Sequence, residues 1–421
     1  MRFEHLQDWL DWQQTLHSEK IKLGLERVAR VARELGLMRP DFRVVMVSGT
    51  NGKGSITAIL ESIYHEAGYR VAAYTSPHLL HYNERIRIGK KNVEDAPLCA
   101  AFDLVDQARG DLSLSYFEFG TLAAMQIFST LPLDVAVFEV GLGGRLDAVN
   151  IYDADASIVS SVGLDHVQWL GSTRESIGLE KAGIFRTGKP AVCGDNDPPE
   201  TLLKYARDID SRLYLVGEDF SYRQGSDGRW AFRTEKLDWD DLPAPNLYGD
   251  VQVGNAAAAL MSIQCLDEVL PVQRESVERG LQDICLSGRF QRVVGKCEMI
   301  FDVAHNLDSA KVLGKNLQEL GPASRTYAVF AVLEDKDVEG IIGSVCEQID
   351  EWYISELDSE RSLDCADLQD RIVRLDPDAI VHTCPSVEQA WQAVEKEACE
   401  TSRIVVFGSF LTVAEVICLH V

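Results

Sequence analysis

Residues 47–55 read VSGTNGKGS and follow directly on the apolar run 42–46. A buried run that ends in a glycine-rich turn is typical of a strand leading into a helix, which we expect over about 54–67. Glycines let backbone N–H groups approach phosphate oxygens, and the start of a helix adds partial positive charge. Lys53 can reach β- and γ-phosphates, and Ser55 can place a hydroxyl on Mg²⁺. We therefore interpret the stretch as a nucleotide-binding loop.

The stretch departs from the common phosphate-loop spacing G-x-x-x-x-G-K-[ST]. Val47 stands where the first glycine would be, and Gly54 separates Lys53 from Ser55. Three readings follow: a degraded nucleotide site, a chance glycine turn, or a different kind of phosphate loop. The strand before it and the helix after it favour nucleotide binding.

Composition indicates a multidomain protein of the cytoplasm. The chain has 421 residues, enough for two or three domains, and 46% are hydrophobic. We find no apolar run near the roughly 18 residues of a membrane helix, no signal peptide and no C-x-x-C pair among ten cysteines. The net charge of −25 argues against nucleic acid or an anionic membrane as the main partner. We expect a monomer.

Short apolar runs alternate with helical stretches along the whole chain, which predicts βαβ units and buried parallel sheets. The expected strands are 42–47, 71–75, 134–140, 156–161, 190–193, 298–303, 326–332, 351–355, 379–382 and 404–407. Residues 219–246 look like a small β excursion. We predict an α/β protein. A P-loop NTPase-like N-terminal domain with a mostly parallel sheet would span 1–287, and a smaller Rossmann-like α/β domain would span 288–421.

A second glycine-rich stretch, FEVGLGGRLDA, covers 138–148. Glu139 ends an apolar strand, where a buried carboxylate is costly without a partner. A Mg²⁺ shared with the phosphates would supply that partner at the carboxyl edge of the sheet, where ligands bind. Arg145 and Asp147 lie nearby. A tight turn is the simpler alternative for these glycines.

Two further positions after predicted strands carry chemistry. His166, in GLDH at 163–166, ends a strand at the same sheet edge as Glu139, which makes it a candidate metal ligand. Lys181, in EKAGIF at 180–185, borders an apolar run, and a buried lysine loses its proton readily. It could act as a base, bind a phosphate or react with CO₂ to give a carbamate, and a structural salt bridge is as good an interpretation.

The second half of the chain has fewer such positions. DVAHN at 302–306 closes the first strand there, with Arg289 shortly before it. Asn255 opens a predicted helix, and capping is its simplest role. Ser409 ends the last strand and would either cap a helix or bind a carboxylate.

Taken in order, GTNGKGS, FEVGLGGRLDAVN, GLDH, EKAGIF, GRF and D-x-AHN resemble the folylpolyglutamate synthase/dihydrofolate synthase family, within the larger group of Mur ligases. The resemblance covers most of the chain. It implies an ATP-dependent amide ligase in which a carboxylate attacks the γ-phosphate and L-glutamate displaces phosphate from the resulting acyl phosphate. Implied partners are ATP, dihydropteroate, reduced folates and L-glutamate, with Mg²⁺ and a second cation such as K⁺.

The resemblance also assigns residues. ATP would be bound by Gly49, Thr50, Asn51, Gly52, Lys53, Gly54, Ser55, Asn255, Arg289 and Asp302. The metal would be held by Ser55, Glu139 and His166. The pteroate and glutamate substrates would contact Ser76, Pro77, Arg85, Phe117, Glu118, Leu146, Asp147, Ala148 and Ser409. The catalytic candidates are Lys53, Lys181, His166 and His305, and Lys181 matches the lysine that family members carry as a carbamate. One departure is Val303, where the family often has glycine.

Three other functions compete with this one. The chain could be a folylpolyglutamate synthase without the first activity, a cell-wall Mur ligase, or a P-loop switch that only hydrolyses nucleotide. The segments IKLGLERVARVA, at 21–32, and TSPHL, at 75–79, favour folate, and only about 45 residues precede the phosphate loop, too few for a usual UDP-binding domain. The metal set and the second domain weigh against a switch.

Overall fold

The computed structural model describes residues 1–17, 23–225 and 228–419, so that residues 21–22 of the IKLG segment lie outside it. The chain forms two compact α/β units. The first contains Met1–Asn246 and Gln252–Ile284, and the second contains Leu247–Val251 and Cys285–Val421. The main crossing between them lies a few residues before the expected boundary, and Leu247–Val251 is an additional excursion into the second unit.

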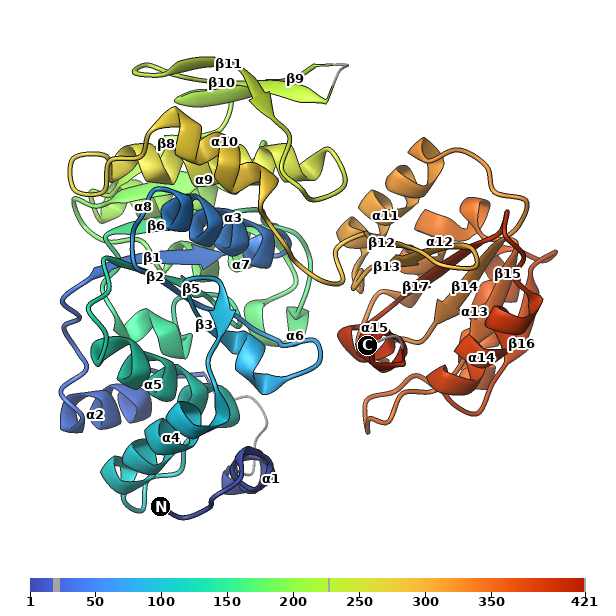
Figure 1. Cartoon of the computed structure of the whole chain (residues 1–421), viewed down its shortest axis with the longest axis horizontal. Helices are drawn as coiled ribbons and strands as arrows, with labels where there is room; N and C mark the ends of the chain where they lie inside the picture. The colour runs from blue at the N-terminus through green and yellow to red at the C-terminus, as the bar shows by residue number, and fades with distance from the viewer. Residues whose placement is uncertain (18–22, 226–227, 420–421) are drawn as a thin grey trace. The chain divides into compact units, whose positions relative to one another are not determined.

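The first unit is built on an eight-stranded sheet (Figure 1). Its strands are β1 (Arg43–Ser48), β2 (Val71–Tyr74), β3 (Ile86–Ile88), β4 (Lys91–Asn92), β5 (Val135–Glu139), β6 (Ala156–Val159), β7 (Pro190–Cys193) and β8 (Arg212–Leu215). The order is β4-β3-β2-β5-β1-β6-β7-β8. Within this order, the six strands β2, β5, β1, β6, β7 and β8 run parallel to one another. At one edge, β3 pairs antiparallel with β2, and β4 pairs antiparallel with β3.

Helices cover both faces of this sheet, which explains why its central strands are apolar without alternation. They are α1 (Leu6–Leu16), α2 (Glu26–Glu34), α3 (Lys53–Glu66), α4 (Asp95–Arg109), α5 (Tyr116–Ser129), α6 (Val167–Leu170), α7 (Arg174–Ala182), α8 (Glu200–Asp208), α9 (Val251–Cys265) and α10 (Arg274–Gln282), with 3₁₀ turns η1 (Tyr82–Arg85) and η2 (Ala148–Ile151). Figure 1 shows α4 and α5 on the face opposite α3 and α10. Trp9 of α1 packs against Phe102 and Phe119 of α4 and α5.

The expected β excursion forms a separate three-stranded antiparallel sheet. It consists of β9 (Phe220–Gln224), β10 (Arg229–Thr234) and β11 (Asp238–Pro243). Trp230 and Phe232 form its buried side, and Arg274 of α10 donates a hydrogen bond to the Asp240 carbonyl oxygen. This small sheet therefore packs on the helical layer and does not extend the main sheet.

The second unit has a six-stranded sheet of order β12-β13-β17-β14-β15-β16. The strands are β12 (Gln291–Val294), β13 (Glu298–Phe301), β14 (Thr326–Phe330), β15 (Glu351–Ile354), β16 (Ile380–Thr383) and β17 (Arg403–Phe407), all parallel except β12. The helices are α11 (Leu307–Glu319), α12 (Val338–Val345), α13 (Cys365–Leu375), α14 (Val387–Glu397) and α15 (Phe410–Cys418), with the 3₁₀ turn η3 (Cys346–Gln348). Helices α11, α12 and α13 share one apolar core with the sheet, and Trp391 of α14 packs on Phe301.

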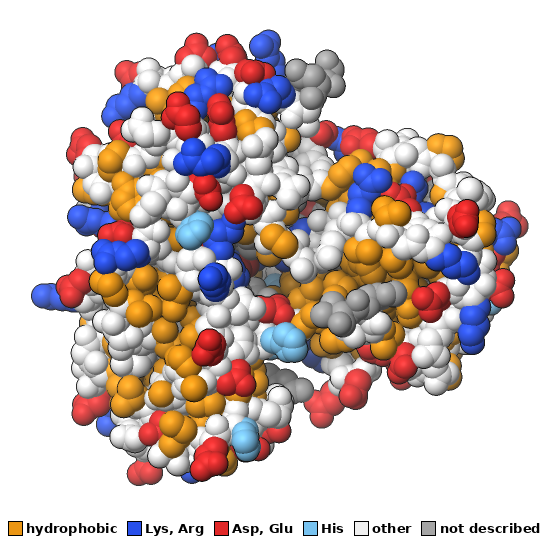
Figure 2. Space-filling view, in the orientation of Figure 1, with side chains coloured by type: hydrophobic (Ala, Val, Ile, Leu, Met, Phe, Trp, Pro, Cys, Tyr) orange, Lys and Arg blue, Asp and Glu red, His pale blue; other side chains and the backbone are white. Residues whose placement is uncertain are grey.

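The alternating strands and helices and the mostly parallel sheets confirm the predicted α/β fold class. No helix among the described residues is both long and apolar enough to cross a membrane. On the face shown in Figure 2, Lys and Arg side chains are interspersed with Asp and Glu side chains.

Candidate active site

The phosphate loop connects β1 to α3, as expected from the sequence. Gly49 has φ 150° and Gly52 has φ 86°, a conformation that favours glycine at both positions. A Cβ added to Gly49 would lie 1.8 Å from the Ser160 Oγ, and one added to Gly52 would lie 2.6 Å from the Asn255 Oδ1. The glycines are therefore required both by the turn and by close neighbours.

Residues just after β6 hold the loop in place. The Thr50 N–H donates to the Ser161 carbonyl oxygen at 2.9 Å, and the Asn51 N–H donates to the Ser161 Oγ at 3.1 Å. The Ser160 hydroxyl donates to the Asn51 carbonyl oxygen at 2.5 Å. Sequence reasoning missed Ser160 and Ser161, because nothing in the local pattern tells which strand lies beside the loop.

Lys53 folds back over the loop that precedes it. Its Nζ donates to the carbonyl oxygens of Gly49 at 2.8 Å and Thr50 at 3.1 Å. These two bonds hold an ammonium group at the mouth of the loop, next to the N-terminus of α3. The same group is well placed to bind phosphate oxygens.

Glu139 and Ser55, the predicted metal ligands, are both buried near the phosphate loop. Glu139 ends β5, beside Val47 of β1, and only 5% of it is exposed. Ser55 lies in the first turn of α3 and is 2% exposed. Among the described residues, no group of three or more His, Cys, Asp and Glu side chains is arranged to hold a metal. One carboxylate and one hydroxyl fit Mg²⁺ that is bound mainly through nucleotide phosphates and water.

His166 lies after β6 as the residue that starts α6. Its backbone is left-handed at φ 51°, and its N–H donates to the Asp165 Oδ1 at 2.8 Å. Its side chain is 34% exposed, and its Nε2 lies 4.0 Å from the Asp165 Oδ2. The backbone hydrogen bond to Asp165 fixes this turn, and the role of the His166 imidazole as a metal ligand stays a prediction.

Lys181 is buried in α7, with 3% exposed. Burial lowers the pKa of Lys181 well below its usual value, the charge of Lys53 lowers it further, and Asp165 opposes these effects. The ion pairs and hydrogen bonds of the described residues include no side-chain partner for Lys181, which disfavours the alternative of a structural salt bridge. A lowered pKa increases the neutral fraction of a lysine, and the neutral amine is the form that reacts with CO₂.

Asp147 is a buried carboxyl group at the start of η2. Its Oδ2 accepts the Leu142 N–H at 2.8 Å and its Oδ1 accepts the Val149 N–H at 3.1 Å. Burial raises the pKa of Asp147 to about 7, although these backbone donors and the charge of Lys53 act in the opposite direction. Lys53 therefore acts electrostatically on both Lys181 and Asp147, so three predicted residues from separate segments share one region.

The residues flanking Asp147 are largely structural. The Leu146 carbonyl oxygen accepts the Gly24 N–H at 3.2 Å, which brings the N-terminal segment to this region. Ala148 is buried, and Arg145 forms an ion pair with Glu180 at 2.7 Å. Nothing in the sequence pattern predicted that Gly24 lies beside Leu146.

The expected substrate wall is formed by the loop after β2 and by the start of α5. The Ser76–Pro77 peptide is cis, and the Ser76 N–H donates to the Glu139 Oε2 at 3.3 Å. Phe117 packs against Gly141, where an added Cβ would lie 2.7 Å from its ring. Glu118 uses one oxygen for the Ser115 N–H and the other for Arg27 at 2.9 Å. Glu118 therefore holds the start of α5, and contact of Phe117 or Glu118 with a substrate stays a prediction.

The position of Asn255 in its helix differs from the expected one. Helix α9 begins at Val251, so Asn255 lies inside the helix and does not cap it. Its Nδ2 donates to the Gln252 Oε1 at 3.0 Å, and its Oδ1 faces Gly52 of the phosphate loop. The helix starts earlier than the sequence suggested because Val251 and Gln252 are compatible with its first turn.

In the second unit, Asp302 and Arg289 come together at the end of β13. Asp302 accepts the Phe290 N–H at 2.9 Å and the Ala304 N–H at 2.8 Å, and burial raises its pKa to about 6 against the opposing charge of Arg289. Val303 is absent from the residues with positive φ in the described part of the chain, and the left-handed turn is made by Phe290 at φ 45°. A β-branched residue therefore fits at Val303.

His305 and Ser409 lie near the same strand ends of the second unit. The His305 Nδ1 lies 2.8 Å from the Val303 carbonyl oxygen, and its ring is 5.9 Å from that of Phe410, which also lies under Arg289. Ser409 is 4% exposed and caps α15 by accepting the Thr412 N–H at 3.0 Å. Of the two roles expected for Ser409, the structure contains the helix cap.

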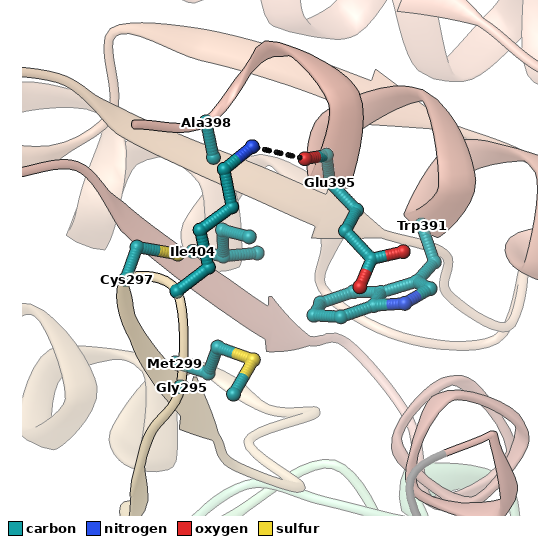
Figure 3. Close-up of a pocket in the computed structure, with 8 residues that line it drawn as sticks. Gly295, Cys297, Met299, Trp391, Glu395, Ala398 and Ile404 are labelled. Carbon is teal, nitrogen blue, oxygen red and sulfur yellow. Dashed lines mark hydrogen bonds between the residues drawn. The ribbon is translucent and has the colours of Figure 1, made fainter. Parts of the chain in front are cut away.

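A cavity of about 220 Å³ in the second unit lies elsewhere (Figure 3). It is lined by Gly295, Lys296, Cys297, Met299, Trp391, Glu395, Ala398 and Ile404, and Lys296 spans it to the Glu395 carbonyl oxygen at 3.1 Å. These residues flank the starts of β13 and β17. The predicted residues of this unit lie instead at the strand ends, so the cavity does not belong to the candidate site.

Comparison with known proteins identifies a family and several solved structures that this chain resembles. The family described as Mur ligase, glutamate ligase domain, matches residues 288–410. Dihydrofolate synthase/folylpolyglutamate synthase of Escherichia coli (strain K12) is 41% identical over 411 residues, covering 98% of this chain and 94% of that protein. A structure of E. coli FolC in complex with DHPP and ADP has a TM-score of 0.93 at 40% identity, covering 99% of this chain and 98% of the other. A bifunctional folylpolyglutamate synthase/dihydrofolate synthase with Mn, AMPPNP and L-glutamate bound has a TM-score of 0.92 at 40% identity, with the same coverages of 99% and 98%.

A phosphate loop on a parallel sheet, joined to a Mur ligase-type glutamate ligase domain, defines an ATP-dependent ligase. The expected enzyme class is thereby confirmed. Within that class, the chain belongs to the dihydrofolate synthase/folylpolyglutamate synthase family.

Proposed function

We propose that this protein joins L-glutamate to dihydropteroate and then adds γ-linked glutamates to reduced folates, with ATP and Mg²⁺. The observation that carries the proposal is that three predicted segments meet at one sheet edge: Glu139 ends β5 beside Val47, which leads into the phosphate loop, and it accepts the N–H of Ser76. Relatives that carry both activity names, and a neighbour with Mn, AMPPNP and L-glutamate bound, support it.

In this proposal the phosphate loop and Lys53 bind ATP, and Ser55, Glu139 and His166 hold the metal. When bound, Mg²⁺ neutralises charge on the β- and γ-phosphates. A substrate carboxylate oxygen attacks the γ-phosphorus, and ADP leaves. The amine of L-glutamate then attacks the acyl carbon and loses a proton as phosphate leaves, which gives the amide. Positioning and charge neutralisation do most of the work in such a transfer.

The remaining residues have supporting roles. Asp147, with Phe117 and the backbone at 146–148, would orient the pterin ring, since a carboxyl group with a pKa of about 7 can both accept and donate hydrogen bonds. Lys181 as a carbamate would add negative charge beside the metal. Asn255 would contact the nucleotide from α9, and the roles of Arg289, Asp302 and His305 in nucleotide and glutamate binding stay predictions from the sequence.

Product analysis tests the proposal. Purified protein is incubated with ATP, Mg²⁺ and L-glutamate, together with either dihydropteroate or tetrahydrofolate, and the products are identified by mass. We expect dihydrofolate from the first acceptor and glutamate-extended folates from the second, each with stoichiometric ADP. Extension without dihydrofolate formation would indicate a folylpolyglutamate synthase alone. Equal phosphate release with and without acceptor and glutamate would rule out a ligase.

We further propose that the protein is a cytoplasmic monomer. All ten cysteines are free thiols in the structure, which suits a reducing compartment. Sedimentation of the purified protein tests the oligomeric state, with a single species near 46.8 kDa expected.

A further inference from the structure

The segment between β6 and α6 ends in the predicted metal ligand His166, and side chains from other segments hold its backbone. Val162 of this segment is 3% exposed, so both of its backbone polar groups need partners. Its N–H donates to the Asp195 Oδ2 at 2.6 Å, and its carbonyl oxygen accepts the Arg174 Nε–H at 2.8 Å. We call Arg174 and Asp195 together the Val162 clamp.

The two residues of the clamp are also bonded to each other. The Arg174 Nη2 lies 3.2 Å from the Asp195 Oδ1, in an ion pair whose carboxylate side chain is 11% exposed. Arg174 is the first residue of α7, and Asp195 follows β7, so the clamp joins two separate elements to Val162. Desolvation offsets much of the attraction in a partly buried pair, so this pair is better suited to fix a geometry than to add stability.

The clamped segment connects directly to the candidate active site. Gly163 donates its N–H to the Thr50 Oγ1 at 2.9 Å, and the same hydroxyl donates to the Gly163 carbonyl oxygen at 3.1 Å. Asp165 acts on the pKa of Lys181, which it raises against the larger effect of burial. The segment is therefore bonded to the phosphate loop and close to the buried lysine, with His166 at its end.

The same arginine has an outward branch, which provides an internal comparison. The Arg174 Nη1 donates to the Asp197 Oδ2 at 2.8 Å, and the Asp197 side chain is 91% exposed. The backbone of Asp197 donates to the Asp195 Oδ1 at 2.9 Å and accepts from the Arg174 Nη2 at 2.6 Å, and neither bond needs the Asp197 side chain. Truncation of Asp197 therefore leaves both bonds to Val162 in place, whereas truncation of Asp195 removes one of them.

We propose that Arg174 and Asp195 are positioning residues for the divalent metal: by holding Val162 they set the place of His166, and with it the affinity of the site for metal bound with nucleotide. This inference rests on the proposed function, in which His166 is a metal ligand. Residues 160–166 form no strand or helix, so bonds from other segments must fix their path. Groups that orient a metal ligand without touching the metal have a large effect on metal affinity.

Metal binding with and without the clamp tests this inference. Electron paramagnetic resonance measures the dissociation constant of Mn²⁺ in the presence of saturating ADP, and titration of fluorescent ADP in EDTA measures nucleotide binding without metal. We expect Asp195→Ala to weaken Mn²⁺ binding about tenfold or more, as for other residues that orient a metal ligand. ADP binding in EDTA should change less than about twofold, because the bonds of Ser161 to the phosphate loop remain.

A double-mutant cycle with His166→Ala separates positioning from other effects. If Asp195 acts through His166, Asp195→Ala should weaken Mn²⁺ binding less than about twofold further once His166 is replaced by alanine. A merely structural role, or a direct effect of the Asp195 charge on the metal, would give the same factor in both backgrounds. That result overturns the inference, as does unchanged Mn²⁺ binding by Asp195→Ala or an equal loss of metal-free ADP binding.

The matched control is Asp197→Ala, which removes one negative charge from the same network but no bond to Val162. Its Mn²⁺ binding should stay within about twofold of wild type, since an exposed ion pair contributes little. A loss as large as that of Asp195→Ala would contradict the clamp. Circular dichroism checks the fold of each variant.

Two remaining cases also have defined readings. Should Asp195→Ala fail to fold, Arg174→Lys decides, because it keeps the charge but lacks the planar fork that reaches Val162 and both aspartates. A loss of Mn²⁺ binding that disappears in the His166→Ala background supports the inference, and an equal loss in both backgrounds contradicts it. If wild-type protein binds no Mn²⁺ with ADP, or if His166→Ala alone leaves Mn²⁺ binding unchanged, the metal assignment of the proposed function is wrong and the inference fails with it.

Discussion

At the scale of single residues, burial shifts the pKa of two groups in the predicted site, Asp147 and Lys181. Asp147 accepts backbone N–H groups that should favour the carboxylate, yet burial is the larger effect and raises its pKa to about 7. Lys181 experiences burial and a neighbouring positive charge, and both lower its pKa. Perturbed groups of this kind are frequent at functional sites, and here they coincide with positions predicted from motifs.

Asp147 makes folding stability depend on pH. Between the ordinary pKa of 3.8 and the folded pKa of about 7, the folded protein binds a proton that the unfolded chain has released. Stability from this group therefore falls as pH rises through that window and is constant above it. Comparing Asp147→Asn with wild type in urea, we expect the difference in unfolding free energy to shift by about 2 kcal/mol in favour of the variant from pH 5 to pH 8. A shift of opposite sign contradicts the raised pKa.

Substitution of Lys181 tests whether this lysine carries a carbamate. We expect Lys181→Ala to lower kcat by about 100-fold, as for other groups that support a metal site, and added formate or acetate to restore part of the rate. The matched control is Lys204→Ala, an exposed lysine of α8 that pairs with Asp208, which should retain full activity. In a crystal equilibrated with CO₂, unmodified Lys181 bonded to a carboxylate would refute the modification.

At the scale of elements, the predicted parallel strands are present with small shifts at their ends. β7 spans 190–193 as predicted, and β1 spans Arg43–Ser48 against an expected 42–47. The strands β3, β4, β8 and β12 were not predicted, because they are short, lie at or next to a sheet edge, and lack a continuous apolar run. The local pattern of apolar residues predicts strands that are buried on both faces well. It predicts short strands near a sheet edge poorly.

The candidate site shows the same limit. Motif glycines, Lys53, Glu139 and Asp147 could be predicted because each follows a recognisable strand. Ser160 and Ser161 act through partners far along the chain, and neither periodicity nor spacing marks them. Asn255 was placed near its helix, but its capping role was wrong because the helix starts at Val251.

The turn between β1 and α3 gives an element-scale prediction. Gly49→Ala should weaken ADP binding by about 100-fold or more, because the added Cβ would lie 1.8 Å from the Ser160 Oγ and the backbone conformation disfavours alanine. Gly343→Ala in α12 is the control: its Cβ meets nothing within 4 Å, so ADP binding should be unchanged and stability should rise by about 0.5–1 kcal/mol. Fluorescent ADP titration and urea unfolding measure the two effects, and tight ADP binding by Gly49→Ala contradicts the loop assignment.

At the scale of the whole molecule, each of the two units has its own buried core. Independent cores predict separable unfolding steps in calorimetry. The phosphate loop lies entirely in the first unit, so AMPPNP with Mg²⁺ should stabilise that unit by about 2.7 kcal/mol at 100 times its dissociation constant. Lys53→Met should remove this stabilisation. If the nucleotide stabilises the second unit alone, the assignment of the phosphate loop is wrong.

The most direct measurement is anomalous diffraction from crystals of the protein with Mn²⁺ and AMPPNP. We expect the manganese peak within about 2.3 Å of the Ser55 Oγ and of a Glu139 carboxylate oxygen, with the γ-phosphate beside Lys53. A metal that contacts Ser55 while both Glu139 and His166 lie far from it would contradict the convergence of these segments on one activated carboxylate.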